Sequence, residues 1–562
     1  MIDLFDPDRH GWTFDVPEKV LVGPPGTGKT RAVLTSWILP ALAELDPDKI
    51  IACSFTKAAA IELRERVSEQ AGIQDWKLLQ TCSTIHSIAY RMIGHPPIWE
   101  ERMAGDPTRV RTSKDGDSDL DQPLEGMSVP CKELRAEARR LWDLGRTIEH
   151  GLAKMEPSES DVSLVLSAAL RRTETRRDVD ELRAEILTFE AQKQAVGAID
   201  FTDMLLHALW SGEPLHKDLM IVDEAQDLSP LQIALIGSWS RECKNLVWVG
   251  DPDQGIYAFA GADGHHLTSL IRDGVPSWSL QQSYRVPSEI HILARKTILL
   301  NKNRVDSPYL PMEKTGSVTH ADTYRDQSDF IEENEGREMF ILARTKARVG
   351  AHAVDLSQRG IPFLNERGKS PWQSGVLRKL VLCISDLLAG RLVGREALLA
   401  YVSAVPGRPR SPLIVGTKKD AKAAVKALDD GKFTRADEVA GLGIDIGALK
   451  RLKTLNGALS HMGKLEACTP LMMILDRYGT NGLRNEPSIT ITTMHASKGR
   501  EAPAVLLDLE TPFPVKLMAN RGDVEGIESE RRVLYVAITR AKDALCMRRT
   551  FGDLADVLGV DI

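Results

Sequence analysis

One glycine-rich stretch near the start of the chain constrains its fold more than any other feature. An apolar run at 20–22 leads into GPPGTGKT, and the residues after this motif begin a helical pattern. Glycines at this spacing let the backbone curl so that its N–H groups point inward at a polyphosphate. Lys29 supplies a positive charge for the terminal phosphates, and the Thr30 hydroxyl is a ligand for Mg²⁺. The pattern predicts a nucleotide-binding loop made by Gly23, Pro24, Pro25, Gly26, Thr27, Gly28, Lys29 and Thr30.

The composition is that of an ordinary globular protein with room for several domains. The 562 residues are 43% hydrophobic and 27% charged, and the formal net charge is −7. This charge excludes a globally basic coat for nucleic acid, although a local basic groove is compatible with it. The seven cysteines form no CxxC pair, which favours reduced thiols over a zinc or iron–sulfur site. With no signal-like N-terminus and no apolar run of about 18–20 residues, we expect a soluble cytoplasmic protein.

Alternating strand-like and helix-like segments predict a parallel sheet that gathers its ligands at the carboxyl ends of the strands. One buried strand-like run, 219–222, ends in two adjacent carboxylates, Asp223 and Glu224. At the same edge as the phosphate loop, Asp223 is placed to hold Mg²⁺ through water and Glu224 to polarise the attacking water. One carboxylate would fit an acidic turn, but two after a buried strand favour a catalytic pair.

A further strand-like run at 245–251 is followed by polar and aromatic residues. Gln254 is neutral and both donates and accepts hydrogen bonds, which suits a sensor of the γ-phosphate. Tyr257 and Phe259 stand two positions apart, a spacing that puts both rings on one face of a strand. Core packing and base stacking explain these two rings equally well on this pattern alone.

Two segments, 131–196 and 372–487, have helical patterns and interrupt the strand–helix alternation. Outside them, a series of motifs spans nearly the whole chain: GPPGTGKT (23–30), SFTKAAAIELRERV (54–67), TIHS (84–87), IDFTDML (199–205), VDEAQD (222–227), VGDPDQGIYAFAGA (249–262), LQQSYR (280–285), GIPF (360–363), TTMHASKGREAP (492–503) and ERRVLYVAITRAK (530–542). On these motifs and their order the chain resembles the UvrD/Rep/PcrA group of superfamily 1 DNA helicases. A phosphate loop alone would identify only the broad superclass of P-loop nucleotide-binding proteins.

The resemblance implies an α/β fold with two RecA-like P-loop domains, 1A and 2A. In each, a parallel sheet is flanked by helices and a mainly helical insertion, 1B or 2B, interrupts the domain. The implied boundaries are 1–89 and 198–277 for 1A, 90–197 for 1B, 278–370 and 488–562 for 2A, and 371–487 for 2B. Proteins of this family bind ATP in the cleft between the RecA-like domains and single-stranded DNA across them.

The resemblance also implies roles for residues around the nucleotide. The loop at 23–30 would bind the triphosphate through Lys29, with Thr30 and Asp223 serving Mg²⁺. Glu224 resembles the catalytic base of the family, and Gln254 resembles its γ-phosphate sensor. The other implied residues are the arginine fingers Arg285 and Arg540, reaching in from 2A, the adenine-sandwiching pair Tyr284 and Arg31, and the ribose ligand Glu501.

Further residues fall in motifs that face DNA in this family, namely Phe55, Thr56, His86, Tyr257, Phe259 and His495. The resemblance therefore favours base stacking over core packing for Tyr257 and Phe259. Such stacking is worth about 1–3 kcal/mol per base.

The sequence departs from the family pattern at several positions. The family's N-terminal adenine-reading glutamine has no counterpart, since residues 1–19 contain no glutamine. With adenine held mainly by stacking, we expect weak discrimination between ATP and GTP. Ala260 stands where the family commonly has arginine, which predicts weaker coupling of hydrolysis to DNA. Ser283 and Ile85 replace the usual asparagine and phenylalanine.

These features predict an ATP-dependent helicase or translocase that moves 3′ to 5′ on single-stranded DNA and unwinds duplex. The direction is implied by the resemblance alone. One alternative is a DNA-dependent ATPase that acts as a regulatory switch or displaces proteins without unwinding, and the other is the motor subunit of a helicase–nuclease complex. The expected ligands are ATP, Mg²⁺, single-stranded DNA and ss/ds junctions, and a protein loading partner or nuclease subunit is a further expected partner.

Overall fold

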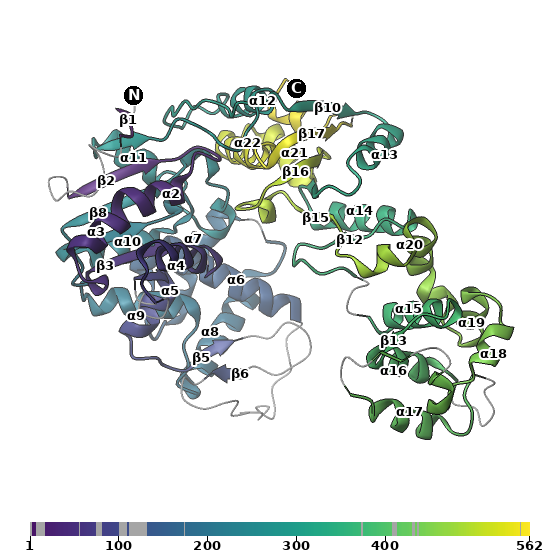
Figure 1. The fold of residues 1–562 in the computed structure, drawn as a ribbon. Helices are drawn as coiled ribbons and strands as arrows, with labels where there is room; N and C mark the ends of the chain where they lie inside the picture. Colours follow the sequence, from purple (N-terminus) through teal and green to yellow (C-terminus); the bar gives the residue numbers. More distant parts are fainter. Residues whose placement is uncertain are drawn as a thin grey trace. The chain divides into compact units, whose positions relative to one another are not determined.

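The computed structural model of this chain describes residues 3–6, 17–54, 57–74, 81–100, 109–111, 132–173, 175–371, 375–406, 413–429, 433–434, 438–550 and 552–561. The chain divides into two compact units (Figure 1). Unit 1 comprises Met1–Lys314 with Asp523–Tyr535, and unit 2 comprises Thr315–Gly522 with Val536–Ile562. Among the described residues, no helix combines the length and the apolar character that a bilayer crossing requires.

Unit 1 is built around a seven-stranded sheet in which every described pairing is parallel. The strands lie in the order β1 (Asp3–Leu4), β9 (Ser277–Ser279), β2 (Glu18–Val22), β8 (Asn245–Gly250), β7 (Leu219–Val222), β3 (Ile50–Ser54) and β4 (Cys82–Thr84). The residues of β8, β7 and β3 are all buried, as expected for parallel strands covered on both faces. In register, Val22 pairs with Gly250 and Val222 with Trp248, so these strands end together at one edge.

Helices cover both faces of this sheet because alternate strand residues point to opposite sides. Leu21, Ile221 and Val249 point to one face, where they pack with buried residues of α2 (Lys29–Val33), α3 (Leu39–Glu44) and α4 (Lys57–Ala71). Val22 and Val222 point to the other face, which packs against α5 (Ile85–Met92), α9 (Phe201–Ser211), α10 (Pro230–Trp239) and α11 (His266–Arg272). The unit also contains α12 (Ser288–Ile298). A π-helical turn, Leu34–Ile38, joins α2 to α3.

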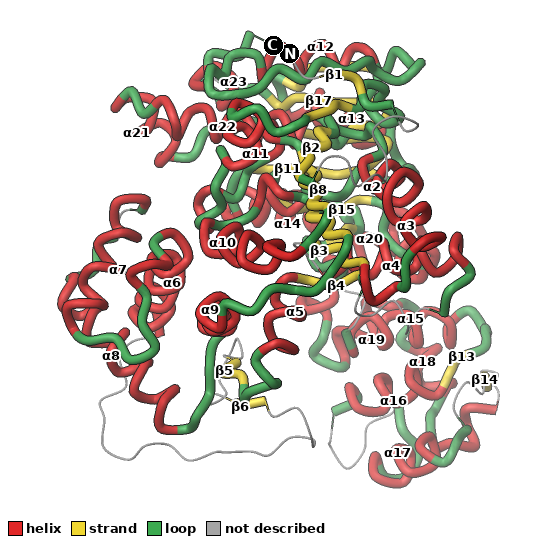
Figure 2. Tube along the Cα trace, turned by 90° about the vertical axis from the view of Figure 1, so that its left-hand side faces the viewer, coloured by secondary structure: helices red, strands yellow, loops and turns green. Residues whose placement is uncertain are grey.

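A helical lobe interrupts the α/β order of unit 1, as the helical pattern at 131–196 predicts. It consists of α6 (Lys132–Ile148), α7 (Glu159–Arg172) and α8 (Val179–Ala195), which pack side by side (Figure 2). Its core contains Trp142, Val162 and Ile186, all fully buried. A short antiparallel hairpin, β5 (Ile98–Glu100) and β6 (Arg109–Arg111), precedes it in the chain.

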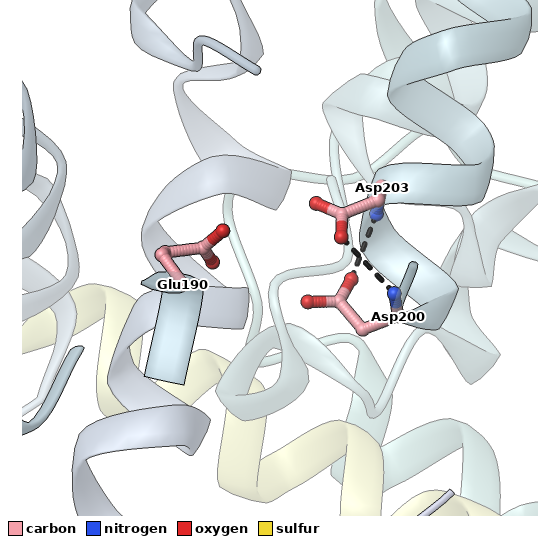
Figure 3. A group of neighbouring side chains, drawn as sticks. All are labelled: Glu190, Asp200 and Asp203. Atoms are coloured by element: carbon pink, nitrogen blue, oxygen red, sulfur yellow. Dashed lines mark hydrogen bonds between the residues drawn. The ribbon is translucent and has the colours of Figure 1, made fainter. Parts of the chain in front are cut away.

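A buried ionic network joins this lobe to α9, and Figure 3 shows its three acidic side chains. Glu190 on α8 approaches Asp200 and Asp203 at the start of α9, where the two aspartates form a reciprocal capping box. Three carboxylates this close could hold a cation, but two basic side chains already form ion pairs with them. The Arg146 guanidinium, 2% exposed, lies 2.8 Å from Asp200 and 2.5 Å from Asp203. The Lys193 ammonium lies 2.6 Å from Asp200 and 2.9 Å from Glu190.

Unit 2 contains a six-stranded sheet, again with every described pairing parallel. The strands lie in the order β10 (Ser317–Ala321), β17 (Ala541–Arg548), β16 (Ala502–Asp508), β11 (Met339–Ala343), β15 (Ile489–Thr493) and β12 (Phe363–Leu364). The helices of this α/β part are α13 (Tyr324–Glu333), α14 (Lys346–Gln358), α21 (Phe513–Arg521), the end of α22 (Val524–Ile538) and α23 (Leu554–Leu558). Two parallel sheets flanked by helices confirm the predicted fold class.

The second predicted helical block forms a lobe with its own hydrophobic core. Its helices are α15 (Val376–Leu388), α16 (Arg395–Ala404), α17 (Lys418–Lys426), α18 (Ile446–Arg451), α19 (Leu455–His461) and α20 (Leu465–Arg484), with a hairpin of β13 (Val393–Gly394) and β14 (Phe433–Thr434). Gly479, at φ 62, kinks α20. The boundaries of 1A, 1B, 2A and 2B stay a prediction.

The ionic network predicts a measurable contribution to stability. Arg146→Met would leave Asp200 and Asp203 buried with less positive charge, and breaking a buried pair in this way costs about 3–5 kcal/mol. The control is Arg66→Met, because Arg66 and Glu62 form an exposed pair, 45% and 60% exposed. Such a pair contributes about 0–1 kcal/mol. Urea unfolding followed by tryptophan fluorescence compares the two variants, and equal losses would contradict a stabilising role for the network.

Candidate nucleotide and nucleic-acid site

The phosphate loop lies in unit 1 between the end of β2 and the start of α2. Gly26 has φ 72 and Gly28 has φ 82, in the left-handed region that residues other than glycine rarely adopt. Gly28 occupies the N-cap of α2 and has no side chain to cap it. The first N–H groups of the helix therefore face the loop, which is the arrangement that binds phosphate elsewhere.

Close packing also explains two of the loop glycines. A Cβ atom on Gly23 would lie 2.0 Å from Cγ of Lys29, and a Cβ atom on Gly26 would lie 2.4 Å from Cβ of Arg285. The Lys29 ammonium donates to the Gly23 carbonyl at 3.1 Å and lies 4.0 Å from a carboxylate oxygen of Glu224. Lys29 is thus held over the loop and beside the candidate base.

Residues 280–285 run across the loop and are hydrogen-bonded to it, and we call this segment the strap. The backbone N–H of Leu280 donates to Val22 at 2.9 Å, and that of Tyr284 donates to Gly26 at 2.8 Å. The hydroxyl of Ser283 donates to the Pro25 carbonyl at 2.8 Å. Ser283, the departure from the usual asparagine, therefore keeps a polar contact with the loop.

The strap and α2 line an open cavity of about 460 Å³ beside the loop. Arg31 and Tyr284, the residues predicted to sandwich adenine, both line it together with Thr27 and Gly28. Tyr284 is 70% exposed, so its ring face is accessible to a ligand. The cavity adjoins the phosphate loop, as a base pocket must.

The predicted carboxylates follow β7 at the edge where β2 also ends. The N–H of Asp223 donates to the Cys53 carbonyl at 2.9 Å, which fixes its position after the strand. Burial, and next the Glu224 carboxylate, raise the pKa of Asp223 to about 7. Glu224 has φ 54, which is uncommon for a residue other than glycine and is typical of functional sites.

The residues present fit a bound Mg²⁺ ion. Thr30 and Asp223 offer a hydroxyl and a carboxylate oxygen, the ligand type that Mg²⁺ prefers. The raised pKa of the buried Asp223 also indicates a carboxylate that a nearby cation would stabilise in its ionised form. These two residues would hold the ion, which would offset negative charge on the β- and γ-phosphates.

Two further polar groups follow β8. The amide of Gln254 is buried and donates to Asp251 at 2.7 Å. Burial and the neighbouring Asp253 raise the pKa of Asp251 to about 6. Asp253 in turn accepts from the Arg304 guanidinium at 2.6 Å.

One further residue, Gln226, connects these groups although its motif assigns it no role. Gln226 donates to the Glu224 carboxylate, while its amide oxygen accepts the N–H of Asp251 at 3.0 Å. It therefore links the candidate base to the loop that carries Gln254. Its place in the VDEAQD motif was the only available signal.

The candidate DNA-facing residues of unit 1 differ in local structure and in exposure. Tyr257 and Phe259 do not lie on a strand face as predicted, because Ala258–Ala260 form a 3-10 turn that ends at Gly261, φ 90. Their rings contact edge to face, with centroids 6.1 Å apart, and Phe259 is 63% exposed. This exposure argues against core packing for Phe259.

His86 lies in the first turn of α5, and burial lowers its pKa to about 4. Its ring contacts Phe201, which is 49% exposed and which the sequence analysis did not single out. The only feature of the sequence that pointed to Phe201 was its place in the IDFTDML motif. Phe55 and Thr56 lie outside the described residues.

Three candidate residues belong to unit 2. Arg540 is 1% exposed, and its guanidinium donates to the carbonyls of Val536 at 2.9 Å and Arg500 at 3.2 Å. Glu501 lies 3.3 Å from the Lys542 ammonium. His495 follows β15, and burial together with nearby positive charge lowers its pKa to about 4. Unlike Arg540, Arg285 belongs to the same unit as the phosphate loop.

Comparisons with known proteins give consistent matches. Residues 14–274 match the UvrD/REP helicase N-terminal domain, and residues 459–550 match the UvrD-like helicase C-terminal domain. The chain is 25% identical over 572 residues to the ATP-dependent DNA helicase UvrD2 of Mycobacterium tuberculosis (strain ATCC 25618 / H37Rv), covering 94% of this chain and 76% of the relative. It is 23% identical over 619 residues to the ATP-dependent DNA helicase PcrA of Staphylococcus aureus (strain MRSA252), covering 95% and 81%.

The position of Glu224 predicts a separation of binding from turnover. Glu224→Gln keeps the size of the side chain but removes a base, so we expect ATP binding close to wild type and hydrolysis slower by roughly 10²–10⁴-fold. The control is Glu242→Gln, which changes an exposed carboxylate of the same unit. Binding and phosphate release measured on all three proteins test this, and near-normal hydrolysis by Glu224→Gln would remove it from the chemistry.

Proposed function

The chain belongs to the UvrD/PcrA-type superfamily 1 helicases, and we propose that it uses ATP hydrolysis to move 3′ to 5′ along single-stranded DNA and to unwind duplex. One observation carries the ATP site. The phosphate loop and the carboxylates Asp223 and Glu224 follow neighbouring parts of one parallel sheet, with Lys29 only 4.0 Å from Glu224. Polyphosphate binding and water activation are thus combined at one edge.

In the proposed reaction each residue has a defined task. The N–H groups of the loop and Lys29 hold the phosphates, and Glu224 accepts the proton of the attacking water. Gln254, linked through Asp251 and Gln226 to Glu224, senses the γ-phosphate. Arg285 and Arg540 are proposed as arginine fingers, which neutralise charge on the transferred phosphoryl group and contribute roughly 10³–10⁵-fold in rate.

Residues proposed to bind the adenosine complete the nucleotide-binding site. Arg31 and Tyr284 hold the base between them, which the cavity they share supports. Glu501 is proposed to accept from the ribose hydroxyls. Its present neighbour is the Lys542 ammonium.

The proposed DNA surface uses stacking more than charge. Phe259 and Phe201 are exposed rings, and Tyr257 and His86 contact them edge to face. His86 and His495 are neutral at pH 7, since the pKa of each is lowered to about 4. They are therefore suited to stacking and hydrogen bonding rather than to neutralising phosphate. Stacking tolerates any base, which a motor on mixed sequence requires.

A second candidate function is a DNA-dependent ATPase that acts as a switch or displaces proteins without unwinding. Ala260, in the turn beside the exposed Phe259, favours it because alanine offers no charge or hydrogen bond to link nucleotide and DNA. A motor subunit of a helicase–nuclease complex would share the same nucleotide and DNA sites and would need a nuclease partner. Single-stranded DNA and ss/ds junctions are the proposed substrates in each case.

Strand displacement separates these functions. We expect ATP-dependent unwinding of a duplex with a 3′ single-stranded tail and little unwinding of a matched duplex with a 5′ tail. ATP hydrolysis on the same substrates is measured in parallel. Hydrolysis stimulated by DNA without strand displacement would favour the switch or protein-displacing translocase. Unwinding of only the 5′-tailed substrate would contradict the proposed direction.

A further inference from the structure

The cavity beside the phosphate loop contains a side chain with no assigned role. We propose that Gln281 reads the edge of the purine base and makes this site select adenine over guanine nucleotides. The inference rests on the proposed function, because it takes the cavity between the strap and α2 as the base pocket. It concerns which nucleotide the site accepts, and so it adds to the ATPase assignment.

The backbone at Gln281 is held from two sides. Leu280, the preceding residue, donates to Val22 at 2.9 Å and thereby ties the strap to the strand that leads into the loop. The carbonyl of Gln281 itself accepts the N–H of Leu310 at 2.6 Å, and Ser283 donates to the Leu310 carbonyl at 2.9 Å. A side chain that begins at such a fixed point has a defined reach into the cavity, as recognition of a base edge requires.

The two glutamines of the strap differ in what their amides do. Gln282 donates to the carbonyls of Ser283 at 2.9 Å and Pro311 at 2.8 Å, so its amide holds the strap together. Both glutamines line the cavity and are partly buried, but the side-chain amide of Gln281 makes no hydrogen bond to any residue that the structure describes. Gln281 thus offers one donor group and one acceptor to a ligand in the cavity.

Two hydroxyl side chains line the cavity from the helix side. Thr35 and Ser36 line it from the π-helical turn Leu34–Ile38, a conformation that often marks functional sites. Ser36 is 5% exposed, and its hydroxyl has no hydrogen-bond partner within the described parts of the chain. A buried hydroxyl normally has a partner, so this one indicates a ligand or water that the protein alone does not supply.

The amide of glutamine matches adenine better than guanine. Adenine presents its exocyclic amino group beside the N7 acceptor, so a glutamine accepts from the first and donates to the second. Guanine presents two acceptors, O6 and N7, at the same edge, and the amide oxygen then faces O6 without a proton between them. Arg31 and Tyr284 stack on either base equally well, whereas Gln281 distinguishes the two.

This inference replaces the expectation of weak discrimination between ATP and GTP. That expectation rested on the absence of glutamine from residues 1–19. The structure assigns a glutamine to the cavity from the strap, which is distant in sequence from the N-terminus but adjacent to the loop in space.

Calorimetric binding of Mg·ADP and Mg·GDP to the full chain tests the inference. We expect the wild type to bind ADP at least about tenfold more tightly than GDP, the scale of one bidentate base contact. Gln281→Ala should weaken ADP binding by about that factor and leave GDP binding little changed. Gln281→Met keeps a side chain of similar length but has neither the amide donor nor the amide acceptor, and it should cause the same selective loss.

Gln282→Ala is the matched control. It loosens the strap without touching the proposed base contact, so we expect it to weaken ADP and GDP equally. An unchanged ratio of ADP to GDP affinity in both Gln281 variants would overturn the base-reading role while leaving the nucleotide site intact. A wild-type chain that binds neither nucleotide would instead overturn the proposed ATPase function.

Discussion

Hydrogen bonds between the phosphate loop and the strap are the constraint on which the nucleotide site depends. Val22 and Gly26 accept from Leu280 and Tyr284, and these bonds hold two segments more than 250 residues apart in one arrangement. The loop cannot curl without its glycines, and Gly26 must lack a side chain because Arg285 packs against it. In the proposed site, phosphate binding, base stacking and base reading would all depend on this one short piece of backbone.

The parts of the site that could be predicted are those marked by a pattern of residues close together in the sequence. The loop at 23–30 and the carboxylates Asp223 and Glu224 could be predicted because each follows a short run of buried strand residues. The sheets could be predicted from the same strand-like runs, and the two helical lobes from the helical patterns at 131–196 and 372–487. Tyr257 and Phe259 show the limit, since their spacing fits a strand but the neighbouring Gly261, φ 90, ends a 3-10 turn.

The other features of the fold and of the candidate site depend on contacts between residues that are distant in sequence, and no local pattern reveals such contacts. Arg146 meets Asp200 across 54 positions, and Gln226 reaches the N–H of Asp251 across 25. Nothing in the sequence distinguishes Gln281 from Gln282 either, because both line the cavity and only the Gln282 amide is bonded to the Ser283 and Pro311 carbonyls. The acidic group Glu190, Asp200 and Asp203 would suggest a metal site from composition alone, yet Arg146 and Lys193 already form ion pairs with it.

We propose that hydrolysis at this loop drives movement in one direction along single-stranded DNA. The most direct measurement is release of streptavidin from an oligonucleotide biotinylated at one end or the other, with ATP and excess free biotin. Movement in the 3′ to 5′ direction predicts ATP-dependent release that is faster from the 5′ end than from the 3′ end, with or without unwinding activity. Release at equal rates from both ends, or release that does not require ATP, would contradict it.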